Sequence, residues 1–310
     1  MRLPPARGIL LRRAPAVLGS AILLAAAAAR AQTLPPVPDP AALVRHAVAL
    51  RLAEEASHQP LRFAFHKQDD RRVFTQEIVQ TAQGDVARLV AVNDAPLTPA
   101  ARQAEATRLR ALAASPALQQ HRFRREQADQ ARVDKLLGLL PDAFLYRYVD
   151  SESCVVDTIP NIPIPGAAGA PAAVPPTADT CYHLTFTPNP HWNPPDLASR
   201  LLLGLAGDVW IDSSGDRLYR LTAHFIADVD FGWGIVGRFN RGGTVFLEQD
   251  RLSGNDWELT RMKLNLTGKV LLVKALRIRI DETMGDFEPV PQKLDYRQAI
   301  QMLLGSPPTE

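Results

Sequence analysis

The chain has 310 residues, 46% of them hydrophobic, which is enough to bury a core in one large domain or two small ones. Its formal net charge is +2, but five arginines and no acidic residue lie within the first 31 positions. The other 279 residues carry thirty basic and thirty-three acidic side chains, a net charge of −3, so net charge gives no support to nucleic-acid binding.

The N-terminal segment is typical of an export signal. Four arginines flank or precede the apolar run 14–29, and Ala29-Arg30-Ala31 fits the small-x-small cleavage pattern. The alternative is a membrane anchor, but a run of about 16 residues is short for a span. We predict that residues 1–31 are removed near Ala31. The mature protein would then be periplasmic or secreted, with no transmembrane span.

A helix and a meander are predicted next. Residues 32–39 form an extended, Pro-rich leader, and Asp39-Pro40 places an N-cap before a helix that ends near Ser57. Strands at 61–67, 73–81 and 86–92 follow at short spacing, which indicates an antiparallel meander.

Residues 98–140 form a helical insert. Thr98-Pro99 and Ser115-Pro116 each begin a helix. In the two helices together, arginines outnumber acidic residues. One interpretation is a basic lid that meets anionic lipid head groups; the other is an ordinary solvated helical pair.

Strands and loops alternate in the next part of the chain. Residues 144–149 and 182–187 are predicted strands around a Pro/Ala-rich loop, 155–180. The two cysteines, Cys154 and Cys181, lie at the ends of this loop and are predicted to form a disulfide, because the chain is exported. A metal or redox pair would need further ligands or a C-x-x-C spacing, which are missing.

The longest alternating stretch is a predicted hairpin over 207–231. Its second arm alternates for about thirteen residues, which is typical of a strand with one apolar and one polar face. The apolar face would line either a packed core or a lipid-sized cavity. The candidate ligand-contacting residues are Trp210, Tyr219, Leu221, Phe225, Val229 and Phe231.

The C-terminal part is predicted to add three strands and a helix. The strands are 244–250, 257–267 and 269–281, the last two forming a tight hairpin or one strand bent at Gly268. Asp295 caps a terminal helix to about Leu304, before a tail at 306–310.

Together these elements predict an α+β fold in a single domain, 40–305. We expect a strongly curved antiparallel sheet, an open half-barrel of about ten strands, with helices covering its concave face. The stretch Gly207 to Asp212, followed by Leu218 to Leu221, resembles the strand-turn-strand motif of the periplasmic lipoprotein-carrier (LolA/LolB-like) superfamily. The likeness in topology covers residues 40–285. It implies a half-barrel closed by helices over an apolar cavity that holds acyl chains.

The chain departs from that superfamily in three ways. It is longer than a typical carrier, the family's cavity arginine cannot be assigned to one position, and no lipobox cysteine is present. The likeness is therefore closer to exported bacterial proteins that share this layout than to a true sorting carrier.

Signatures of catalysis are missing from the sequence. It has no G-x-S-x-G, H-E-x-x-H, P-loop or dinucleotide fingerprint. A candidate metal site would combine His183, His191 and His224 with Asp228 and Asp230. However, His224, Asp228 and Asp230 stretch about 20 Å along one strand, which is too far for one ion without ligands from other strands. We predict no catalytic residue, metal or cofactor.

The expected function is non-enzymatic. The protein would bind a lipid, an acyl chain or a lipidated partner in the periplasm and serve cell-envelope maintenance. One alternative is an envelope scaffold with a filled core that binds a protein partner through loops 188–206 and 231–243. The other is a periplasmic enzyme of unknown class.

Overall fold

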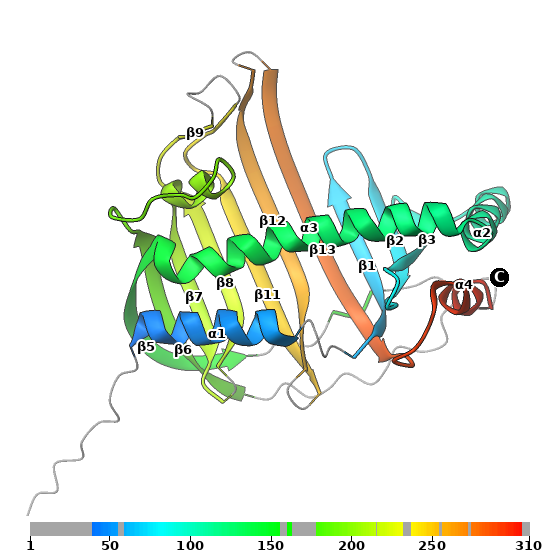
Figure 1. Ribbon diagram of the computed structural model, residues 1–310, viewed down its shortest axis with the longest axis horizontal. Coiled ribbons are helices and arrows are strands. Elements are labelled where there is room, and N and C mark those ends of the chain that lie inside the picture. The colour runs from blue at the N-terminus through cyan, green and yellow to red at the C-terminus, as the bar shows by residue number, and fades with distance from the viewer. Residues whose placement is uncertain are drawn as a thin grey trace, which may run out of the picture. The chain divides into compact units, whose positions relative to one another are not determined.

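The computed structural model describes residues 39–54, 59–155, 160–162, 178–214, 216–231, 237–253, 256–271 and 274–305. The predicted signal segment, the leader up to residue 38, most of the 155–180 loop and the tail 306–310 lie outside these residues. In the described part the fold is α+β, as predicted, with one large antiparallel sheet that does not close (Figure 1).

The sheet contains thirteen strands, against about ten expected. Eleven lie on one path in the order β4-β3-β2-β1-β13-β12-β11-β8-β7-β6-β5, and the short β9 and β10 pair beside β12. The strand bounds are β1 Leu61–Asp69, β2 Val73–Val79, β3 Val86–Val92, β4 Ala95–Pro96, β5 Phe144–Val155, β6 Ala178–Pro188, β7 Leu205–Asp212, β8 Arg217–Phe225, β9 Val229–Phe231, β10 Gly237–Phe239, β11 Thr244–Ser253, β12 Asp256–Val270 and β13 Lys274–Pro289.

The helices begin at caps that the sequence indicates. Asp39 accepts a hydrogen bond from the N–H of Ala41, and Thr98 and Ser115 accept from Ala101 and Leu118. Asp295 accepts from Arg297 and Gln298 in a capping box. The helices are α1 Pro40–Glu54, α2 Pro99–Ala113, α3 Pro116–Ala143, the 3-10 helix η1 Ser199–Gly204 and α4 Tyr296–Gly305.

Several strand boundaries differ from the prediction: β5 and β6 are longer than 144–149 and 182–187, and β13 covers 274–289 in place of 269–281. The alternating arm is two strands, because β8 ends at Phe225 and β9 pairs with β10 instead. The turn between β12 and β13 follows Val270 and not Gly268. Gly268 lies within β12, where β10 approaches closely. A Cβ at this position would lie 2.0 Å from the carbonyl oxygen of Arg238, so only glycine lets β10 pair with β12 here.

The main core lies between α1 and one face of strands β5 to β8, which we call the α1-side face. Val44, Ala47 and Val48 of α1 are buried against Val209 and Phe225. A second core packs α2 and α4 against the ends of β2 and β3, and its largest buried side chains include Leu109 and Ile300. Helices α1, α2 and α4 thus stabilise the sheet by burying an apolar stripe.

The opposite face of the sheet carries the disulfide. Cys154 of β5 and Cys181 of β6 are joined, with Cα atoms 5.5 Å apart, as predicted. Both are buried with Tyr219 and Trp257 in a small third cluster. In the described part of the chain, none of the helices has the length and hydropathy that crossing a membrane requires.

Candidate functional site

Apolar side chains continue across the α1-side face beyond the main core. Leu221 of β8 pairs with Leu247 of β11, and Leu247 with Met262 of β12, so the three share that face. The same pairing extends to β13. We call the partly exposed members of this region the apolar strip: Val245, Leu247, Met262, Leu264, Leu266, Ile278 and Ile280.

Helix α3 crosses the sheet in Figure 1 without packing on it along its whole length. From Arg124 to Val133 every residue is exposed except the half-buried Gln130. Its N-terminal part is held by Gln119, whose side chain donates 2.8 Å to the carbonyl oxygen of Gln83. Its C-terminal part packs Leu137 and neighbouring leucines on the main core. Helix α3 is therefore held by side-chain contacts at both ends, and its exposed middle lies between these contacts.

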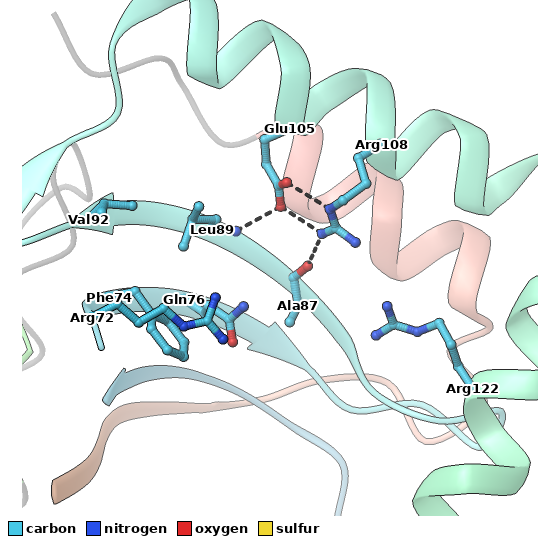
Figure 2. Close-up of a pocket in the computed structure, with 9 residues that line it drawn as sticks. All are labelled: Arg72, Phe74, Gln76, Ala87, Leu89, Val92, Glu105, Arg108 and Arg122. Atoms are coloured by element: carbon cyan, nitrogen blue, oxygen red, sulfur yellow. Dashed lines mark hydrogen bonds and ion pairs between the residues drawn. The ribbon is translucent and has the colours of Figure 1, made fainter. Parts of the chain in front are cut away.

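A pocket of about 400 Å³ lies on the sheet side of α2 and the start of α3 (Figure 2). This volume is in the range of small-molecule sites. Its apolar wall comes from β2 and β3, and its charged groups come from the β1–β2 turn and the two helices. The lining residues are Arg72, Phe74, Gln76, Ala87, Leu89, Val92, Glu105, Arg108 and Arg122.

Glu105 and Arg108 close one side of this pocket. Arg108 donates to both carboxylate oxygens of Glu105, at 2.7 and 2.6 Å, and also to the carbonyl oxygen of Ala87 at 2.6 Å. The N–H of Leu89 donates 2.8 Å to the same carboxylate. Although burial raises it, these hydrogen bonds hold the pKa of Glu105 below its usual value. Glu105 is thus an ionised acceptor whose hydrogen bonds tie α2 to β3.

Two further arginines bring positive charge to the pocket. The guanidinium of Arg72 lies over the ring of Phe74, 4.6 Å from its centre. Arg122 extends from α3 on the other side, and Figure 2 shows both guanidinium groups entering the pocket. Within the described residues, neither guanidinium makes a hydrogen bond or ion pair, although Asp69 acts on Arg72, and Asp85 and Glu126 on Arg122, through space.

A pair of carboxyl groups lies beside the pocket, where α3 meets the β2–β3 turn. The backbone N–H of Asp85 donates to both oxygens of Glu126, at 3.2 and 3.1 Å. Burial, together with the charge of Glu126, raises the pKa of Asp85 to about 7. Burial also raises the pKa of Glu126. The Asp85 carboxyl at this contact between α3 and the turn therefore titrates near neutral pH.

Comparison of the chain with protein-family models, with curated proteins and with solved structures finds no match. What the protein does must therefore be inferred from its own geometry.

The six ligand-contacting candidates from the sequence fall into two groups. Phe225 and Val229 are buried in the main core, and Leu221 and Phe231 pack against it. Tyr219 and Trp210 lie on the opposite face, in the cluster with the disulfide. The pairing slips between Trp210 and Ile211, which leaves Tyr219 as the extra residue of a β-bulge. The bulge turns Tyr219 away from the face that simple alternation assigns to it.

Three of the five candidate metal ligands, His183, Asp228 and Asp230, have other partners. Asp228 and Asp230 both bind Arg238, with the closest contact at 2.6 Å. His183 lies between Asp150 and Asp208 and stacks on Trp210, with ring centres 4.7 Å apart. Among the described residues, no group of three or more potential ligands converges on one point.

The pocket residues were missed by sequence reasoning. The arginine excess of the helical insert was the only signal, and it suggested a head-group contact without naming the residues. Arg72 and Arg122 lie fifty positions apart and carry no motif, so their convergence depends on how α3 crosses the sheet.

Proposed function

We propose that the protein binds a lipid or a lipidated partner in the periplasm, without chemistry, in the service of envelope maintenance. The observation that carries this proposal is the apolar strip. Seven large apolar side chains remain partly exposed on the same face that α3 crosses with its exposed middle. All seven are half-buried and keep part of their apolar surface in contact with water, which is unfavourable, and an acyl chain is a natural cover for that surface.

The predicted curvature of the sheet is part of the same proposal. We infer that the sheet curves into an open half-barrel, with α1 and α3 on its concave side, as in the LolA/LolB-like carriers that the sequence resembles. Long antiparallel sheets twist, and thirteen strands without closure favour such curling. In that arrangement the apolar strip would wrap around a bound chain and remove more of it from water.

The test compares two neighbours on β12 that face opposite ways. Leu264 belongs to the apolar strip, whereas Asn265 is exposed on the opposite face. The chain expressed with its own N-terminus is purified from the periplasm, examined by native mass spectrometry and titrated with a fluorescent fatty acid. We expect co-purified lipid, uptake of the probe, and about tenfold weaker uptake in Leu264→Asp, because a carboxylate would meet the acyl chain.

The Asn265→Asp variant is the matched control and should bind the probe as the wild type does. A lipid-free mass together with no uptake of the probe by the wild-type protein would disprove the proposal. Thermal melting of both variants shows whether each is folded before binding is compared.

The alternative of a protein-binding scaffold has one observation in its favour. A second pocket, of about 430 Å³, lies in the predicted interaction loop, with Trp192, Leu197 and Leu203 in its lining. Leu197 and Leu203 are exposed beside the polar side chains of Asn193, Asp196 and Arg200, and a pocket that combines an aromatic residue with polar groups suits a partner's side chain. A lipid-free protein in the experiment above would favour this function.

A further inference from the structure

The charges of the Arg72–Arg122 pocket do not cancel. Three arginines and one glutamate line it, and the glutamate is already bound by Arg108 and by the N–H of Leu89. Arg72 and Arg122 therefore contribute positive charge that no side chain in the pocket lining balances. Asp69 acts on Arg72 through space, and Asp85 and Glu126 act on Arg122, but none of these three carboxyl groups lines the pocket.

The walls of the pocket suit the neck of an amphiphile. Phe74, Leu89 and Val92 present apolar surface below the two guanidinium groups (Figure 2). Guanidinium groups bind carboxylate and phosphate oxygens through paired hydrogen bonds, and they are less strongly hydrated than lysine. A ligand with an anionic end and an apolar continuation would satisfy both features together.

The pocket opens onto the same sheet face as the apolar strip. Phe74 pairs with Lys67 of β1, Lys67 with Glu282 of β13, and Glu282 with Met262 of β12, so all four side chains share one face. The distance from β2 to β12 is about 14 Å, three strand spacings. The ion pair between Lys67 and Glu282 lies between the pocket and the apolar strip, with the lysine nitrogen 2.6 Å from a carboxylate oxygen.

We propose that this pocket receives the anionic head group, a carboxylate or a phosphate, of an acyl lipid whose chain extends over the apolar strip. This inference rests on the proposed function and names the part of the ligand that the protein recognises. Arg72 and Arg122 bind the anion from opposite sides, and Arg108 keeps the helix-to-strand contact in place. The protein therefore selects acidic lipids over neutral ones of the same chain length.

The experiment uses a fluorescent fatty acid and its methyl ester, which differ only in the charge of the head group. We expect the full-length protein to bind the acid about tenfold more tightly than the ester. In the double variant Arg72→Gln/Arg122→Gln the preference should fall to about twofold or less, while the affinity for the ester stays unchanged. Both guanidinium groups make no hydrogen bond within the described structure, so the double variant should fold, as circular dichroism and melting would verify.

The matched control is Arg124→Gln/Arg125→Gln, which removes the same charge from exposed positions of α3 and should keep the preference. Equal binding of acid and ester by the wild type, or a preference retained in the pocket variant, would overturn the inference while leaving the proposed function intact. Uptake of neither probe would overturn both. Inorganic phosphate that binds the wild type as tightly as the fatty acid does would identify a site for small free anions instead, and would also overturn the inference.

Discussion

At the scale of single residues, Glu248 is a charge buried within the described sheet. It lies on β11, opposite the α1-side face, with only 1% of its side chain exposed. Arg220 donates to one of its oxygens at 2.8 Å and Arg261 to the other at 2.9 Å. Burying one carboxylate between two arginines is tolerated because every partner is supplied by a neighbouring strand.

Replacing Glu248 by glutamine should destabilise the protein by about 3 kcal/mol, at the low end for a broken buried pair. The reason for the lower value is that Arg220 and Arg261 keep about 30% of their side chains exposed, so water partly compensates them. Urea unfolding measures the change. As control, Asp281→Asn removes an exposed partner of Lys263 and should cost less than about 1 kcal/mol. Equal losses for the two variants would contradict this account.

Asp85 predicts a pH dependence with a definite sign. Its carboxyl releases its proton near pH 4 in the unfolded chain but near pH 7 in the folded protein, because of burial and the facing Glu126. The folded state holds the proton over this window. Its stabilising contribution is therefore complete below about pH 4 and is lost as the pH rises through about 7. Arg122 and Glu258 also act on the group, with opposite signs.

The Asp85→Asn variant should therefore lose less stability than the wild type between pH 5 and pH 8, by a few degrees in melting temperature, about 2–4 °C per kcal/mol. Melting curves at the two pH values measure this. Asp196 is a control whose contribution to stability depends on pH with the opposite sign, because hydrogen bonds from Lys135 and Ser199 lower the pKa of its carboxyl to about 2. An identical pH profile for Asp85→Asn and wild type would show that the buried carboxyl does not titrate in this range.

At the scale of elements, α3 combines two different environments. Its ends are fixed by side-chain contacts, but the middle, 124–133, is exposed except for Gln130, and Glu126 near its start contacts the β2–β3 turn. Most helices in proteins are held by burial of an apolar stripe, so an unpacked segment depends on its own helix propensity. The middle of α3 should accordingly open locally before the sheet does.

Amide hydrogen exchange tests this expectation. Residues 124–133 should exchange faster than the central strands β8, β11 and β12. Ala128→Gly should accelerate exchange there about fivefold, the effect of about 1 kcal/mol, without moving the urea midpoint of the whole protein. Ala299→Gly provides the contrast, because Ala299 is fully buried in α4 and its loss should lower that midpoint. Slow exchange at 124–133 in the wild type would mean that the segment is packed after all.

At the scale of the whole molecule, the disulfide joins two strands at the β5 edge of the sheet. Replacing Cys154 and Cys181 by serine should cost about 3 kcal/mol, the loop-entropy value for a closed loop of this length. The melting temperature should fall by about 6–12 °C, and the wild type in reductant should match the variant. A midpoint unaffected by both treatments would mean that the bond does not limit unfolding.

Local interactions explain what the sequence determined by itself. The caps at Asp39, Thr98, Ser115 and Asp295 depend on residues within four positions, and so did their prediction. The bounds of β3 and the start of β1 follow from alternation and turn chemistry in the same way. The α+β class with a large antiparallel sheet followed from the order of these elements, and the cysteine pair from its count and context.

Only the tertiary structure decided the features that depend on a neighbouring strand. The bulge at Tyr219, the end of β8 at Phe225 and the continuation of β12 past Gly268 are set by cross-strand partners, which local alternation does not encode. The pocket has the same origin, since Arg72 and Arg122 converge only because α2 and the start of α3 pack beside β2 and β3. Short-range preferences thus determined which elements form, and long-range packing determined where their side chains meet.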